Sequence, residues 1–286
     1  MQFHHLGLVA AAAVATLGSS HAATILVAGS SKAWTPIPGN YDYVADHQTG
    51  QPAGDIVGTG TNYGFFTTFD NNGDASRVDG TLGFRVRLDA AGGSSSKPAF
   101  DRVLWVGIDA NGNGSVDAFL GVSTQGNTST LGIYAPGDLA NTSPKTTSIA
   151  ASPTYSYAIT SDNYSYRPVD SVFDGGTTND LNANTVDYYL SFTVPFADVA
   201  AFLGLNPADA DQRPLRYVLA TSTQHNSLNQ DLGGIQGNIG STSSWEELGG
   251  FTQPMNASGF IIPEPSTALL VACGFTLAVT RRRRTN

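Results

Sequence analysis

Residues 82–88 read Leu-Gly-Phe-Arg-Val-Arg-Leu, and this stretch decides the fold class. Its apolar side chains stand at every second position, and two arginines, Arg85 and Arg87, alternate with the last of them. Because successive side chains of a β-strand point to opposite faces, one face is apolar and the other carries the arginines. Residues 186–194 (Val-Asp-Tyr-Tyr-Leu-Ser-Phe-Thr-Val) show the same alternation. Both segments are therefore predicted to be strands with one face in a hydrophobic core.

The rest of the chain supplies more strands of the same kind. Residues 103–108 are almost continuously apolar, which is typical of a central strand covered on both faces. Many Gly, Ser, Thr and Asn residues between the apolar runs predict frequent turns. We expect an all-β fold, a β-sandwich formed as one domain by residues 24–248. Further strands are expected at 24–27, 64–69, 119–123, 130–134, 155–159 and 215–221.

One short helix interrupts this pattern. Phe196, Val199 and Leu203 recur at helical spacing, after Pro195 and before Gly204. Proline is favoured at the start of a helix and glycine just past its end. The sequence therefore predicts a single helix over 196–203.

The first 23 residues have the features of a secretory signal peptide. Residues 6–17 form an Ala-rich apolar segment, and Ser20-His21-Ala22 offers a small-x-small cleavage site. We expect an N-terminal signal helix over 1–23 that is removed on export.

The last two dozen residues combine three features in a fixed order. Pro263, Glu264 and Pro265 precede an apolar run over about 266–280, and Arg281, Arg282, Arg283 and Arg284 follow it. Guanidinium groups stay on the cytoplasmic side of a membrane. About 15 helical residues span roughly 22 Å, less than a comfortable crossing of about 20 residues. A short C-terminal membrane helix that anchors the chain weakly is expected.

This order of motif, apolar run and arginines resembles the PEP-CTERM sorting signal of exported bacterial proteins. The resemblance covers residues 263–286 and implies processing by an exosortase-type enzyme. It also implies a transient stay in the inner membrane and delivery to the cell surface or the exopolysaccharide matrix. The body (FRVRL at 84–88, 105–122 and 186–199) loosely resembles exported bacterial β-sandwich domains, a likeness that transfers no activity. Residues 249–262, rich in Gly and Pro, are expected to be a linker.

Composition limits the partners. The formal charge is −9, and only 13% of the residues are charged. An acidic surface repels nucleic acid, so no nucleic-acid partner is expected. The single cysteine, Cys273, lies in the apolar tail, so the body has no disulfide. Its stability must come from core burial, with bound metal as an additional source.

One loop has the spacing of a calcium site. Oxygen-bearing side chains recur from Asp109 to Asp117, and Gly114 allows a sharp turn. Such spacing wraps a loop around a hard cation, as in the first half of an EF-hand. The last EF-hand position is Leu120 instead of glutamate, so weak calcium binding is expected. The alternative is a β-hairpin in which Asn-Gly pairs supply positive φ, and both interpretations can hold together. The predicted ligands are Asp109, Asn111, Asn113, Ser115 and Asp117.

Catalytic patterns are weak, and the chain is predicted not to be an enzyme. It contains no HExxH or GxSxG motif, and Glu246 with Glu247 is a poor carboxylate pair. A structural or interaction module is therefore expected, with calcium as the candidate cation. The alternatives are a glycan-binding module of the exopolysaccharide matrix and, less favoured, a secreted hydrolase. Aromatic clusters near Trp34 and over 155–166, and the polar run 220–234, are interpreted as packing and loop-stabilising elements rather than sugar-binding surfaces.

Overall fold

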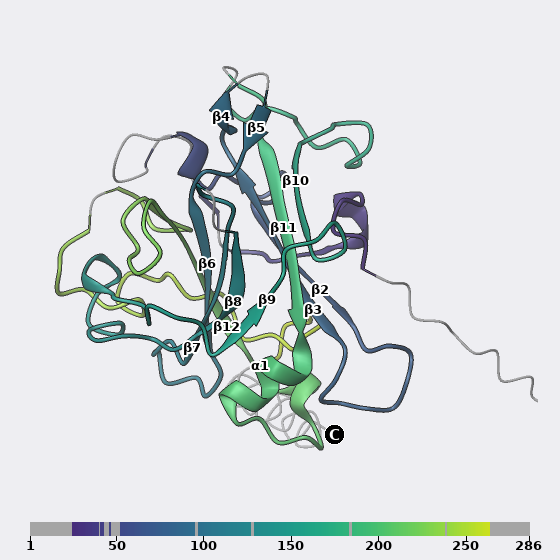
Figure 1. Cartoon of the computed structure of the whole chain (residues 1–286), viewed down its shortest axis with the longest axis vertical. Coiled ribbons are helices and arrows are strands. Elements are labelled where there is room, and N and C mark those ends of the chain that lie inside the picture. The colour runs from purple at the N-terminus through teal and green to yellow at the C-terminus, as the bar shows by residue number, and fades with distance from the viewer. Residues whose placement is uncertain are drawn as a thin grey trace, which may run out of the picture.

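Two antiparallel β-sheets pack face to face in the computed structural model, as in a β-sandwich (Figure 1). The prediction of an all-β body with one short helix is confirmed. Both long strands predicted from their alternation are present, and each pairs with the other in the first sheet. The structure describes residues 25–39, 41–42, 46, 52–94, 97–126, 129–182, 185–237 and 239–263.

The first sheet has five strands, and the segment that decided the fold class lies at its centre. Its order is β1 (Thr35–Pro36), β2 (Phe65–Asp70), β3 (Thr81–Leu88), β11 (Tyr188–Pro195) and β10 (Tyr164–Pro168). The register of β3 and β11 pairs Val86 with Leu190 and Phe84 with Phe192. Side chains of the same kind therefore lie opposite each other on the core face.

The second sheet has six strands, with the apolar run 103–108 inside it. Its order is β13 (Asp231–Leu232), β12 (Arg216–Ser222), β6 (Val103–Asp109), β7 (Ala118–Ser123), β8 (Thr130–Tyr134) and β9 (Tyr155–Tyr157). A small separate hairpin joins β4 (Gly92–Ser94) to β5 (Lys97–Ala99). The predicted central position of 103–108 is confirmed, because β6 has β12 on one side and β7 on the other.

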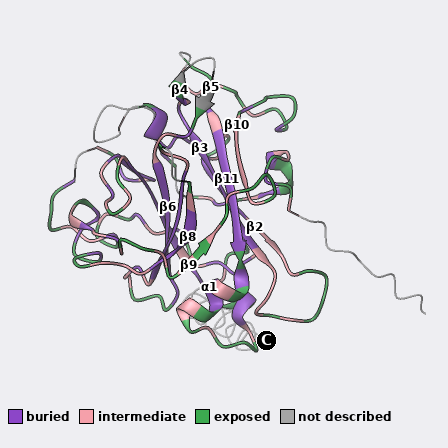
Figure 2. Cartoon of the chain, in the orientation of Figure 1, coloured by how far each residue is buried: buried purple, intermediate pink, exposed green. Residues whose placement is uncertain are grey.

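The main core lies between the sheets and is organised around aromatic rings. Phe84 of β3 contacts Phe65, Phe192 and Tyr217, with ring centroids 5.1 to 5.9 Å apart. The three contacts are stacked, tilted and edge-on respectively, and such aromatic pairs add stability beyond the area that they bury. Figure 2 shows the central strands, such as β3, β6 and β11, as buried along most of their length, whereas β9 at the edge of its sheet is not.

Each sheet also carries a smaller apolar cluster on its outer face, under loops. On the second sheet, Trp105 and Phe119 pack with Trp245. On the first sheet, Trp34, Phe66 and Tyr189 form the corresponding cluster. Continuous apolar strands such as β6 follow from this double coverage, because both of their faces are buried.

The helix α1 (Phe196–Leu203) forms where the spacing predicts it. Gly204 ends it in the left-handed conformation, with φ 63°, and its N–H caps the last turn. One predicted strand is wrong, because the part of 24–27 that is described adopts no strand. Short 3-10 turns occur at Ser31–Ala33 (η1), Pro52–Gly54 (η2), Pro144–Thr146 (η3) and Ala210–Gln212 (η4).

Residues 249–262 do not form the expected linker; they belong to the body. Met255 exchanges two backbone hydrogen bonds with Leu215, of 2.8 and 3.0 Å, and forms a bridge to Ile261. Its side chain is fully buried in the main core. The Gly and Pro residues that suggested a flexible spacer instead make tight turns, such as Gly259 with φ 82°. The expected domain boundary at 248 therefore moves beyond 262.

Both predicted targeting segments lie outside the described residues. These are the signal peptide, 1–23, and the sorting signal, of which only Pro263 is described. The predicted membrane helix, 266–280, is among the residues not described. Among the described residues, no helix has the length and apolarity that a membrane crossing requires.

The corrected boundary predicts an effect on stability. Met255→Ala should lower the free energy of unfolding by about 2–4 kcal/mol, because it leaves a cavity in the main core. Phe260→Ala, at a side chain that is 69% exposed, is the matched control and should change it by less than about 0.5 kcal/mol. Urea denaturation of both variants measures the difference. Equal, small effects would mean that 249–262 behaves as a spacer after all.

Candidate metal centre

The loop that was predicted to bind calcium closes the hairpin between β6 and β7. Asp109, the last residue of β6, is fully buried. Its carboxylate accepts hydrogen bonds from the backbone N–H groups of Gly112 (2.7 Å) and Gly114 (3.0 Å). Arg216 of β12 lies 3.5 Å from the same carboxylate. The side chain therefore holds the loop in its turn.

Three of the other predicted ligands, Asn111, Asn113 and Asp117, also accept hydrogen bonds within the loop. Asn111 accepts one from the N–H of Asn113, and Asn113 accepts one from the N–H of Ser115. Asp117 accepts hydrogen bonds from the N–H of Ala110 and from the amide of Asn111. The structure thus brings all five predicted residues into one loop, and local hydrogen bonds account for its shape.

The hairpin interpretation of this loop is confirmed. Gly112 and Gly114 have φ of 72° and 78°, as expected from the two Asn-Gly pairs. Burial, with the charge of Asp109 as a smaller cause, raises the pKa of Asp117. Calcium binding by this loop stays a prediction.

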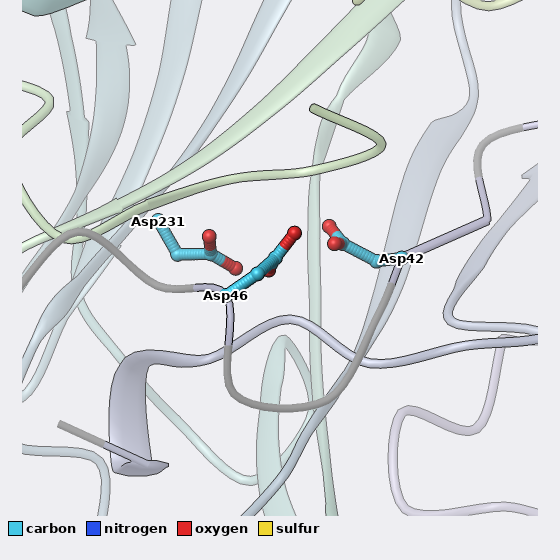
Figure 3. A group of neighbouring side chains, drawn as sticks. All are labelled: Asp42, Asp46 and Asp231. Carbon is cyan, nitrogen blue, oxygen red and sulfur yellow. The ribbon is translucent and has the colours of Figure 1, made fainter. Parts of the chain in front are cut away.

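A second acidic group, which the sequence analysis missed, joins distant parts of the chain. Asp42, Asp46 and Asp231 each place a carboxylate oxygen within 4.8 Å of the others. Asp42 and Asp231 are buried, and Asp46 is half-buried. Figure 3 shows the three carboxylates turned toward one another, with Asp46 between the other two. We refer to these three residues as the aspartate cluster.

Backbone pairing positions the two buried members of the aspartate cluster. Asp42 forms an antiparallel bridge with Gly58, and its carboxylate accepts a 2.7 Å hydrogen bond from the N–H of Gly234. Asp231 lies in the edge strand β13, and its carboxylate accepts a 2.7 Å hydrogen bond from the N–H of Ile56. The carboxylate of Asp42 is therefore held by the segment that follows Asp231, and the carboxylate of Asp231 by the segment that pairs with Asp42.

The electrostatics of the aspartate cluster favour either protonation of its carboxylates or the binding of a cation. Burial, together with the charges of Asp55 and Asp46, raises the pKa of Asp231 to about 8. Asp55 is itself fully buried. Like charges that are removed from water destabilise each other unless something neutralises them. Converging carboxylate oxygens are the ligands that Ca²⁺ and Mg²⁺ prefer, so a divalent cation would supply that neutralisation.

A buried amide lies beside this region. The side chain of Gln230 is fully buried, and it packs against the backbone of Gly54, next to Asp55. Its amide oxygen and nitrogen make no hydrogen bond to any described residue. Buried polar groups in folded proteins are normally hydrogen-bonded. This amide could therefore still form hydrogen bonds to a partner close to the aspartate cluster.

The other residues considered from the sequence have ordinary structural partners. Glu246 forms a 2.7 Å ion pair with Arg216, and Glu247 accepts a hydrogen bond from the N–H of Ser244. In the polar run 220–234, the amide oxygen of Asn229 accepts a hydrogen bond from the N–H of Thr223. This polar run stabilises its own loop, and it also carries Asp231.

The aromatic group over 155–166 packs rather than presenting free rings. The hydroxyl of Tyr157 donates a 2.7 Å hydrogen bond to Asp198, and Tyr166 stacks on Tyr188 with centroids 5.0 Å apart. These rings lie partly buried against the main core. The interpretation of this group as packing is confirmed.

Comparisons with known proteins give no information about the site, which is therefore interpreted from its geometry alone. No protein-family model, curated protein or solved structure matches this chain. One weak signal for the aspartate cluster is present in the amino-acid sequence, namely the spacing of Asp42 and Asp46 in YDYVADH. The partner of this pair, Asp231, could be found only from the folded chain.

The raised pKa of Asp231 predicts a pH dependence of stability in the presence of a chelator. A carboxyl group whose folded pKa lies above its unfolded value contributes stability at low pH, and this contribution is lost as pH rises toward the folded value. Between pH 5 and pH 8, the free energy of unfolding should therefore fall by roughly 3–4 kcal/mol through this group, at about 1.36 kcal/mol per pH unit. Asp231→Asn should remove that part of the slope.

Urea denaturation at pH 5, 6.5 and 8 measures the slope. Asp162→Asn, at an exposed aspartate, is the matched control and should keep the slope of the parent protein. If Asp231→Asn and the parent gave parallel curves, the carboxyl group of Asp231 would have an ordinary pKa.

Proposed function

We propose that this chain is an exported module that acts structurally, or through interactions, at the cell surface or in an exopolysaccharide matrix. The observation that carries the proposal is the order of three features at the C-terminal end. Pro263-Glu264-Pro265 is followed by an apolar run and then by four arginines. An exosortase-type enzyme would process this tail, and the inner membrane would hold the chain until then.

The fold supports this role in one respect. The body remains packed up to Ile262, since its N–H donates a 2.8 Å hydrogen bond to Pro254. The proposed recognition motif begins at the next residue. Cleavage near the motif would therefore release a body whose strands and core are complete, as a module that works outside the cell requires.

A bound divalent cation would stabilise the module. The aspartate cluster is the best candidate site, because its three carboxylate oxygens converge within 4.8 Å and two of its members are buried. The loop 109–117 is the second candidate, since its oxygens already serve the loop's own backbone. Extracellular modules commonly bind Ca²⁺ with dissociation constants of about 10⁻⁴ to 10⁻³ M, which suits an exported protein.

Sorting is tested by mass spectrometry of the protein from its native cell. Both ends should be shortened, the first near Ala23 and the second near Pro263. Replacing Pro263, Glu264 and Pro265 by alanine should leave the tail uncut, whereas Thr285→Ala should be processed normally. Recovery of the intact chain from the cytosol would overturn the proposal.

Cation binding is tested by thermal unfolding with and without Ca²⁺. At a Ca²⁺ concentration of about 100 times the dissociation constant, stabilisation is about 2.7 kcal/mol, or roughly 5–10 °C in Tm for a body of this size. Asp231→Asn should abolish the rise if the aspartate cluster binds the ion, and Asp109→Ala should abolish it if the loop does. A Tm of the parent protein that Ca²⁺ and Mg²⁺ leave unchanged would remove the cation from the proposal.

A further inference from the structure

A pocket of about 300 Å³ lies on the outer face of the first sheet. Its volume is at the lower end of the range for small-molecule sites, about 300–1,000 Å³. Four aromatic residues line it, together with the hydroxyl-bearing residues Ser31, Thr61 and Thr177. The rings belong to Trp34, Tyr63, Phe66 and Tyr189. Apolar faces next to hydroxyl groups match the two kinds of surface that a sugar ring presents.

A buried positive charge lies directly beneath these rings. The guanidinium of Arg85, on β3, is centred 4.4 Å from the ring of Trp34 and 5.3 Å from the ring of Tyr189. The Arg85 side chain is fully buried. It donates hydrogen bonds to Ser191 and to the carbonyl groups of Val27 and Gly29. No described carboxylate forms an ion pair with it, and its Nη1 has no hydrogen-bond partner among the described residues.

The carboxylate that lines the pocket is already neutralised. Asp174 accepts two hydrogen bonds from Arg167, of 2.7 and 2.8 Å, and others from the backbone N–H groups of Ser31 and Asp170. Arg87, on the same face of β3, is paired with the buried Asp187. Neither of these carboxylates forms an ion pair with Arg85, although the negative charge of Asp174 favours the protonated form of the guanidinium.

A second cation lies at the rim of the pocket. Lys32 is exposed, and its methylene chain lies against the backbone of Gly175. It makes no ion pair with a described carboxylate. The pocket therefore combines local positive charge with aromatic rings, on a chain whose formal charge is −9. This local charge selects anions against the field of the whole protein.

We propose that this pocket binds an acidic sugar residue, with its carboxylate or sulfate directed toward the exposed Lys32 and its ring against the half-buried Tyr63, next to the buried Trp34. This inference rests on the proposed function, because an acidic polysaccharide is a partner for a module outside the cell. A free inorganic anion would interact with the cations but would make no stacking contact with the rings. A neutral sugar would contact the rings but would form no ionic contact with the cations. An acidic sugar uses both.

The experiment titrates the full chain with three probes: trigalacturonic acid, the neutral trisaccharide maltotriose, and inorganic sulfate. Binding is followed through the indole NMR signals of the three tryptophans, Trp34, Trp105 and Trp245, with Trp34→Phe used to assign the first. Only Trp34 lines the pocket, so its signal should shift with trigalacturonic acid and those of the other two should not. The affinity should fall as salt is raised, because the contacts are ionic.

Two variants and one control separate the site from general charge effects. Lys32→Ala should weaken binding about tenfold through the loss of one charge-assisted contact. Tyr63→Leu, at a half-buried ring, should weaken it by a similar factor through the loss of stacking. Lys145→Ala, at an exposed lysine on the second sheet's side of the chain, should leave the affinity unchanged.

Several outcomes would overturn the inference. These are the absence of binding to trigalacturonic acid, equal binding of maltotriose, sulfate binding that trigalacturonic acid does not exceed, or an affinity that Lys32→Ala and Tyr63→Leu leave unchanged. A protein found outside the cell with its tail removed, but with no affinity for the acidic trisaccharide, would refute the pocket and leave the proposed sorting intact.

Discussion

The pairing of β3 with β11 is the constraint on which the rest of the body depends. Eight consecutive residue pairs join the two strands, from Thr81 with Pro195 to Leu88 with Tyr188. This register directs Phe84 and Phe192 toward the second sheet and turns Arg85 toward the opposite face. A shift by one residue would exchange these faces and place guanidinium groups in the main core. The main core and the buried arginines are thus two results of a single register.

The alternation of side chains predicted most of this framework. The strands around 82–88, 103–108 and 186–194, and the helix over 196–203, follow from local spacing alone. Local spacing does not report what covers the outer face of a sheet. Arg85 and Arg87 were expected opposite the core, and they are, but segments from elsewhere in the chain bury them completely.

Local spacing also does not report contacts between distant residues, and for this reason the aspartate cluster was not predicted. The loop 109–117 was found because its residues are neighbours in the chain. The aspartate cluster was not, because Asp231 meets Asp42 only after β13 has joined β12. The error at 249–262 has a related cause. Glycine and proline indicate turns, and whether such turns join elements of a core or form a free spacer depends on where Met255 is buried.

The aspartate cluster and the cationic pocket both result from charges of one sign that the fold brings together. Carboxylates converge where β13 meets the segment around Asp42, and cations gather on the outer face of the first sheet. Only 13% of the residues are charged, yet the fold brings several charges of one sign together at each of these two places. Sites of this kind are where ions and charged ligands bind with a gain in free energy, because they relieve a desolvation cost that folding leaves in place.

The bridge between Met255 and Leu215 has a mechanical consequence. Pro263 is the last described residue, and isolated backbone hydrogen bonds join the segment before it to its neighbours. Two link Met255 with Leu215, one runs from Ile262 to Pro254, and one runs from Thr252 to Tyr217 of β12. A force applied at Pro263 would load these isolated bonds before the longer strand pairings of β3 with β11 and of β6 with β12. The last segment of the fold would thus yield first under tension and shield the sheets behind it.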